Sequence, residues 1–188
     1  MTLSFTSPVW EFSLPFDQRM IDFTYSYTEP GTNWNSNQIS QRRHLELMDH
    51  ECFQVFVKGL EAVIRKKLFL LQPVKEYKLS LNSLWLNLNG GPDNSIQMCH
   101  IHYPHIAGAY HIMAPENCGD LLIFNPHRDT SYMPWNKTFI AMPHHRTYVP
   151  KVGSGVIFPS WTPHQVLTNN SGLDRLSISF GFNFVDNQ

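Results

Sequence analysis

The sequence predicts a mostly β protein, a sandwich or barrel of short strands with one long α-helix packed on it. Apolar residues recur at three- and four-residue steps between residues 49 and 70. After residue 75, short alternating runs are separated by turn signals at intervals of about eight to twelve residues. The length of 188 residues suits one domain (1–188), with an N-terminal segment (1–75) and a β core (76–185).

The composition is that of a folded, nearly neutral protein. Apolar residues make up 42% and the net charge is −1, which argues against disorder and does not indicate a nucleic-acid partner. No window is long and apolar enough to span a membrane, and residues 1–12 lack the features of a signal peptide. The three cysteines show no CxxC spacing and indicate reduced thiols in a cytoplasmic protein.

The helix expected at about residues 49–70 is amphipathic. Asp49 is a candidate N-cap, and Lys66 and Lys67 lie where the helix dipole favours positive charge. The residues before it are rich in turn formers and aromatics, with weak strand signals at most.

The first long strand is expected at YKLSLNSLWLNLN (77–89). Its alternation changes phase at Asn82–Ser83, which predicts an irregularity there. Seven further strands are expected after it, in the segments QMCHIH, AGAYHIMA, DLLIFN, RTYVP, GVIFP, HQVLT and RLSISFGFNFV.

The last of these strands has a polar and an apolar face, because side chains at i and i+2 share a face. Arg175, Ser177 and Ser179 lie on one side, and Leu176 and Ile178 begin the other. The apolar side is expected to receive the helix. A buried arginine without a partner would cost several kcal/mol. The polar side is therefore expected to border a cavity that binds an anion, or to face an internal carboxylate.

His100 and His102 form an HxH pair that would point the same way on a strand, about 7 Å apart by backbone rise. His164, far away in sequence, is the candidate third ligand. Two close ligands and one distant ligand are typical of a facial metal site with open positions. The alternative is a chance pair in a chain with ten histidines, and His105 and His111 are expected to be ordinary surface or core residues.

FPSWTPHQV followed by RLSISFGFNF resembles the closing segment of the 2-oxoglutarate- and Fe(II)-dependent oxygenases, in particular of a family found in marine bacteria and their phages. CHIHYPHIAGAYHI and ENCGDLLIFNPHR are similar to earlier segments of that family, and SLWLN is similar to its WxN strand. The resemblance covers residues 80–185 and implies a double-stranded β-helix, the jelly-roll or cupin-like barrel. It also implies Fe(II), 2-oxoglutarate as co-substrate, and molecular oxygen.

Residue by residue, the resemblance implies iron ligation by His100 and His164. It implies that Arg175 pairs with the distal carboxylate of 2-oxoglutarate, assisted by the hydroxyl of Ser177. His102 falls where the superfamily usually has Asp or Glu, so the candidate catalytic and metal-binding set is three histidines. Further candidates for the cofactor pocket are Asn87 and Tyr110.

Three functions stay open at this point. The first is an oxygenase, expected to be a hydroxylase of an unidentified small molecule or protein side chain. The second is a three-histidine cupin-type metalloenzyme that does not use 2-oxoglutarate. The third is a non-catalytic jelly-roll binding module. The oligomeric state is also open, with a homodimer among the expectations.

Overall fold

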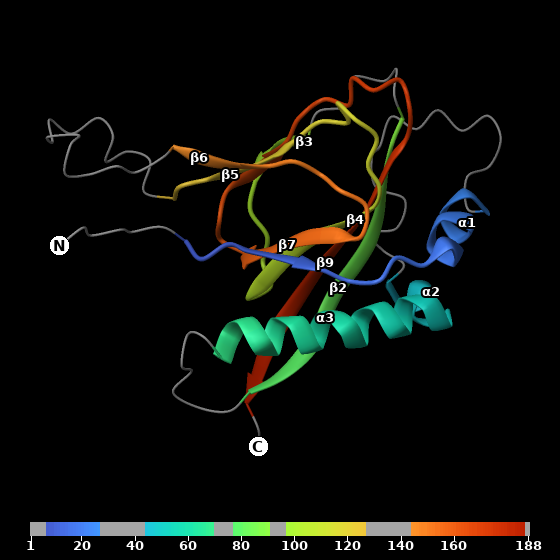
Figure 1. Cartoon of the computed structure of the whole chain (residues 1–188). Helices are drawn as coiled ribbons and strands as arrows, with labels where there is room; N and C mark the ends of the chain where they lie inside the picture. Colours follow the sequence, from blue (N-terminus) through green and yellow to red (C-terminus); the bar gives the residue numbers. More distant parts are fainter. Residues whose placement is uncertain (1–6, 27–43, 70–76, 91–96, 127–143, 187–188) are drawn as a thin grey trace, which may run out of the picture.

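The computed structural model describes residues 7–26, 44–69, 77–90, 97–126 and 144–186. Within these residues two β-sheets form opposing layers, and one long helix, α3 (Glu51–Phe69), covers the outer face of the larger sheet (Figure 1). The structure thus confirms the predicted fold class, mostly β with a supporting helix from the N-terminal half.

Every strand pair in the two sheets is antiparallel. The larger sheet has the order β1 (Trp10–Ser13), β7 (Ser154–Pro159), β4 (Ile106–Met113), β9 (Arg175–Asp186) and β2 (Tyr77–Asn89). The smaller sheet has the order β3 (Gln97–His100), β8 (His164–Val166), β5 (Leu121–Phe124) and β6 (His145–Tyr148). Strands adjacent in each sheet are often distant in sequence, so residues from both ends of the β region come together.

The pairing of β2 with β9 forms the longest ladder of the molecule. Strand β2 spans the predicted residues 77–89, and its register shifts between Leu81 and Ser83, at the predicted irregularity. Beyond this bulge, Asn87 lies opposite Ser177, and Asn89 lies opposite Arg175. The bulge therefore sets which side chains of β2 meet the polar face of β9.

Helix α3 packs on the apolar face of the larger sheet, as expected. It begins at Glu51, close to the predicted start, and Phe53 and Leu60 are completely buried. The sheet supplies the other half of this core, and the side chains of β9 that belong to it are Leu176, Ile178, Phe180 and Phe182. Because the apolar face of β9 packs against α3, the polar side chains of β9 point into the space between the sheets.

Two short helices precede α3 where the sequence indicated only weak strand signals. They are α1 (Gln18–Ser26) and α2 (His44–Met48). Met20 and Thr24 are the buried residues of α1, and the Thr24 hydroxyl donates to the Met20 carbonyl at 2.7 Å. Two buried positions in nine residues give too little periodicity to indicate a helix. None of the helices in the described segments is long and apolar enough to cross a membrane.

The space between the sheets has an apolar part and a polar part. A small apolar cluster fills one part, made of Ala107, Leu121, Ile123, Tyr148, Val156 and Phe158. A small cavity lies in the other part, and the polar side chains that line it come mainly from β2, β4 and β9. Arg175, Asn87 and Ser177 of the candidate site lie in this polar part.

Candidate metal centre and anion pocket

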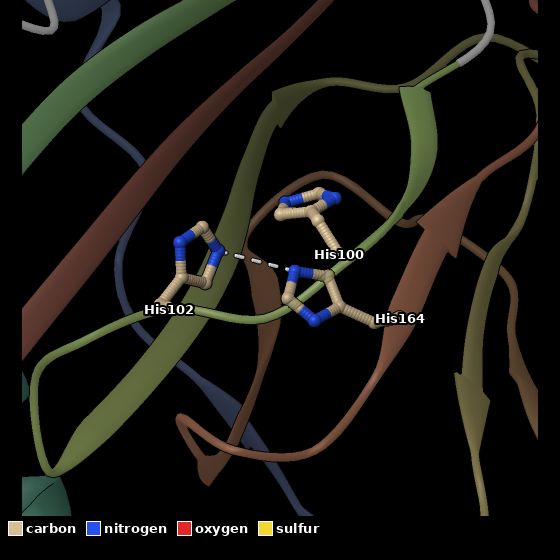
Figure 2. A group of neighbouring side chains, drawn as sticks. All are labelled: His100, His102 and His164. Atoms are coloured by element: carbon tan, nitrogen blue, oxygen red, sulfur yellow. Dashed lines mark hydrogen bonds between the residues drawn. The ribbon is translucent and has the colours of Figure 1, made fainter.

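Three histidines meet where β3 pairs with β8 (Figure 2). His100 ends β3 and lies opposite His164, the first residue of β8. One ring nitrogen from each of His100, His102 and His164 lies within 4.8 Å of the others, and Nε2 of His102 is 3.1 Å from Nε2 of His164. The structure therefore brings together all three histidines that the sequence grouped.

His102 reaches this cluster by a different route from the one expected. Strand β3 ends at His100, so His102 lies in the following loop and the pair does not share a strand face. The backbone N–H of His102 donates to the carbonyl of Ser160 at 2.9 Å, which fixes the loop to the connection between β7 and β8. The Trp85 ring contacts the His102 ring edge to face, with ring centroids 5.5 Å apart.

Backbone carbonyls orient two of the three rings. Nδ1 of His100 lies 2.7 Å from the carbonyl oxygen of Met98, and Nδ1 of His164 lies 3.0 Å from that of Thr162. A carbonyl beside Nδ1 favours the tautomer with hydrogen on that nitrogen. This leaves the Nε2 lone pair of each ring available to a metal ion, as is usual for metal-binding histidines.

Burial keeps two of these imidazoles neutral. It lowers the pKa of His102 to about 4, with a contribution from His100. It lowers the pKa of His164 to about 3, opposed by the Thr162 carbonyl. Neutral imidazole is the form that binds metal ions, so the cluster fits a first-row cation such as Fe(II). Within the described residues the group contains no carboxylate, so its ligands would not neutralise the ion.

Arg175 forms the other half of the site, in the interior of the sandwich. It is only 2% exposed, and burial lowers the pKa of its guanidinium. Nε and Nη2 donate to Oδ1 of Asn89 at 3.3 and 3.0 Å. Nη1 donates to the carbonyls of Cys118 and Gly119 at 2.6 and 2.9 Å. No acidic side chain among the described residues pairs with Arg175, so its charge is solvated but not neutralised.

Arg175 lines a narrow cavity of about 30 Å³ together with the other polar side chains of β2 and β9. Asn87 belongs to this lining, and its Nδ2 donates to Oγ of Ser179 at 2.9 Å and of Ser177 at 3.4 Å. Arg175 and Ser179 are four residues apart on one strand face, about 13 Å by backbone rise. Ser179 lies opposite Trp85, which contacts His102, so a row of polar groups leads from the guanidinium toward the histidines.

Tyr110 lies on the opposite face of its strand, so the expectation that it lines the cofactor pocket is corrected. Its side chain is completely buried against α3, with its ring 4.9 Å from that of Phe56. The hydroxyl donates to the carbonyls of Leu14 and Pro15 at 3.2 and 3.3 Å, and burial raises its pKa to about 12. The face of β4 that packs against α3 therefore holds the large ring of Tyr110.

The same alternation brings His111, which the sequence did not single out, into the cavity. His111 is 5% exposed, and its Nδ1 is buried without a hydrogen-bond partner in the described part of the chain. Burial, followed by the charge of Arg175, lowers its pKa to about 3, and the Ser154 carbonyl opposes this shift. The sequence does contain a signal for this position. His111 alternates with Tyr110 along β4, so it shares a strand face with Ala107 and Ala109 and not with Tyr110.

The fold and these side chains define a double-stranded β-helix with a three-histidine cluster and a buried arginine that no acidic side chain of the described residues neutralises. Residues 83–181, more than half of the chain, match the model of the family described as "Putative 2OG-Fe(II) oxygenase". The chain belongs to this family of non-haem iron oxygenases, for which Fe(II) and 2-oxoglutarate are the implied cofactors. A search of curated proteins returned no match.

Solved structures of similar fold include other oxygenases. A Pseudomonas putida prolyl-4-hydroxylase is similar over 95% of this chain and 89% of its own, with a TM-score of 0.52 and 16% identity. A 2OG-Fe(II) oxygenase family oxidoreductase from Burkholderia pseudomallei is similar over 58% of this chain, with a TM-score of 0.46 and 10% identity. The chain spans about half the length of that protein and of two related structures (47–49%). At 16% identity, the similarity to the prolyl-4-hydroxylase shows a shared fold only.

Proposed function

We propose that the chain is an Fe(II)- and 2-oxoglutarate-dependent hydroxylase whose substrate, a small molecule or a protein side chain, has yet to be identified. One observation carries the proposal. His100, His102 and His164 form a cluster in which burial keeps His102 and His164 neutral, and the inner face of β9 carries a buried guanidinium that has no carboxylate partner among the described residues. Such a site can bind a metal ion at the histidines and the distal carboxylate of a dicarboxylate co-substrate at the arginine.

The histidines would hold the iron, which with 2-oxoglutarate and molecular oxygen supplies the oxidising chemistry. In this role His100 and His164 keep their Nδ1 atoms on backbone carbonyls and present Nε2 to the ion. A set of three protein ligands leaves positions for the co-substrate and oxygen. Burial between two sheets excludes bulk water from this side of the cavity.

Arg175 would bind the distal carboxylate of 2-oxoglutarate. A guanidinium has five N–H donors, and four hydrogen bonds to Asn89, Cys118 and Gly119 already hold it in place. One N–H remains for the ligand, so the attraction is chiefly between a buried cation and an anion. Ser177, next to it on the same strand face, adds a hydroxyl donor, and Asn87 orients that hydroxyl.

The second candidate is a three-histidine cupin-type enzyme that does not use 2-oxoglutarate. The absence of a carboxylate from the histidine group, among the described residues, favours this alternative. In that case Arg175 would bind a carboxylate of the substrate itself. The two candidates differ in whether 2-oxoglutarate binds next to the metal.

The test uses the purified chain with Fe(II) and 2-oxoglutarate, without oxygen for absorption spectra and with oxygen for succinate release. We expect a visible charge-transfer band and slow succinate formation, both lost in His164→Ala because one ligand is removed. His50→Ala is the matched control, since His50 is exposed and lies at the start of α3.

Two results would contradict the proposal. A wild-type protein that shows neither the band nor succinate is not a 2-oxoglutarate-dependent enzyme. Metal binding that is lost in His164→Ala, without any 2-oxoglutarate binding, would support the cupin-type alternative instead.

A further inference from the structure

We propose that the exposed surface around the histidine cluster binds an uncharged, apolar segment of a polypeptide chain. Four exposed side chains, which we call the apolar rim, form this surface: Met98, Ile101, Tyr103 and Trp161. The inference rests on the proposed function where it assigns the bound segment as the substrate. It names the class of substrate that the proposed function leaves open.

The first argument is the position of the rim on the strand and loop that carry two of the histidines. The Met98 carbonyl lies 2.7 Å from Nδ1 of His100, at the end of β3. Ile101 lies between His100 and His102, and Tyr103 directly follows His102. Three of the four rim residues therefore lie within two residues of a candidate ligand.

Trp161, the fourth rim residue, lies between two residues that contact the cluster from the connection between β7 and β8. The carbonyl of Ser160 accepts the backbone N–H of His102 at 2.9 Å. The carbonyl of Thr162 lies 3.0 Å from Nδ1 of His164. The rim thus comes from two segments that are distant in sequence and hydrogen-bonded to each other at the metal centre.

The second argument is that the cluster is open to solvent on the side of the loop after β3. His164 is buried, whereas His100 and His102 are partly exposed. Trp161 is 58% exposed, and Tyr103 is completely exposed, which a side chain inside a closed pocket cannot be. Small molecules usually bind in concave pockets, whereas exposed aromatic side chains are typical of surfaces that bind proteins. The rim therefore fits a polypeptide segment better than a free metabolite.

The third argument is the lack of charged side chains in both segments that form the rim. Residues 94–115 and 152–173 contain no Asp, Glu, Lys or Arg, although these four types make up 15% of the chain. A charged side chain that docked here would lose water without gaining a charged partner from these segments, which is unfavourable. An apolar side chain would gain free energy from burial against the rim. The partner segment should therefore be apolar and uncharged.

A second copy of the chain is the other occupant that an exposed apolar surface could take. Such a dimer would cover the open side of the histidine cluster and close the metal position to a substrate. We therefore expect the rim to be free in solution.

The test selects peptides from a randomised display library on the Fe(II)-loaded protein, without oxygen. A parallel selection on Trp161→Ser removes peptides that bind elsewhere. We expect the enriched peptides to be rich in aliphatic and aromatic residues and poor in charged residues. An enriched peptide, measured by calorimetry, should bind Trp161→Ser about ten- to a hundredfold more weakly than wild type, because exposed tryptophans often dominate the binding energy of an interface.

Val55→Ser is the matched control, because Val55 is 59% exposed and lies on α3, at the outer face of the larger sheet. This variant should bind the peptide as wild type does. Both replaced side chains are exposed, so urea unfolding should give the same midpoint for wild type and the two variants.

Three results would overturn the inference: enriched peptides that are charged, no peptide that distinguishes wild type from Trp161→Ser, or a wild-type dimer that Trp161→Ser converts to a monomer in sedimentation velocity. If wild type forms succinate but selects no such peptide, this inference fails alone. If wild type selects the peptides but does not bind 2-oxoglutarate, the proposed function fails and the assignment of the segment as substrate fails with it.

Discussion

Arg175 shows how a buried charge can be solvated by a protein and still remain available to a ligand. Its hydrogen bonds go to one amide oxygen and two backbone carbonyls, which orient dipoles toward the cation. Dipoles stabilise the charge without cancelling it. An anion that enters the cavity therefore meets a full positive charge in a medium of low effective dielectric constant.

Arg175→Lys should abolish tight 2-oxoglutarate binding, although the charge is kept. An ammonium group cannot reach Asn89 and the carbonyls of Cys118 and Gly119 at once, so at least one buried acceptor loses its donor. We expect an affinity loss of about a hundredfold and a lower free energy of unfolding, by about 2–3 kcal/mol. Calorimetry and urea unfolding measure the two effects.

Arg19→Lys is the control for this substitution. Arg19 is exposed and pairs with Asp17 and Glu51 on the surface, so its replacement should leave ligand affinity and unfolding as in wild type. An Arg175→Lys protein that keeps the wild-type affinity would show that only the charge matters at this position.

At the scale of elements, the loop after β3 depends on a glycine in the neighbouring sheet. A Cβ atom on Gly181 of β9 would lie 2.6 Å from Cγ of Pro104 and 2.6 Å from Oγ of Ser83. Pro104 belongs to the loop that carries His102 between β3 and β4. The close approach of this loop to β9 thus requires a residue without a side chain.

Gly181→Ala should displace the loop and weaken the metal site. We expect a lower free energy of unfolding, by about 1–3 kcal/mol as for other overpacked sites, and a lower affinity for Fe(II) or Zn(II). The reason for the second effect is that His102 follows the shift of Pro104. Urea unfolding of the metal-free protein and a metal titration separate the two effects.

Gly90→Ala is the matched control, because the nearest atom to its added Cβ, Oδ1 of Asp174, is 3.6 Å away. Unchanged metal affinity in Gly181→Ala would show that the loop adjusts without moving His102.

For the whole molecule, the two faces of the larger sheet have different roles. The outer face and α3 form the main apolar core, whereas the inner face holds His111 and Arg175, and the other buried histidine, His164, lies on β8 of the smaller sheet. Burial lowers the folded-state pKa values of His111 and His164 to about 3 each. The interior that forms the candidate site therefore makes the folded state sensitive to acid.

The metal-free protein should lose stability as the pH falls below about 6.5, the ordinary pKa of histidine. Below that pH the unfolded chain binds protons that the folded chain does not bind until about pH 3, so the free energy of unfolding decreases. Each such histidine lowers the free energy of unfolding by about 2 kcal/mol as the pH falls from 6.5 to 4.5.

His111→Leu removes one of these groups and should reduce that loss by about 2 kcal/mol, as measured by urea unfolding at both pH values with a chelator present. Comparing the pH dependence of the two proteins cancels the carboxylates that they share. An identical dependence in both would mean that His111 is charged, or solvated, in the folded protein.

The sequence by itself determined the features that follow from local periodicity. Helix α3, strand β2 with its bulge, and the two faces of β9 were all predicted, because each has a clear contrast between apolar and polar positions. The grouping of His100 with His164 was also predicted from the motif, although the loop position of His102 was not.

Only the tertiary structure decided which face of β4 lines the cavity. One face carries Tyr110 and Ile112, the other Ala109 and His111, and both are largely buried, so the strand itself shows little contrast in polarity. Helix α3 takes the face with the larger ring, and His111 is left beside Arg175. The carbonyls that bind Arg175 could not be predicted either, because backbone groups carry no signature in the sequence.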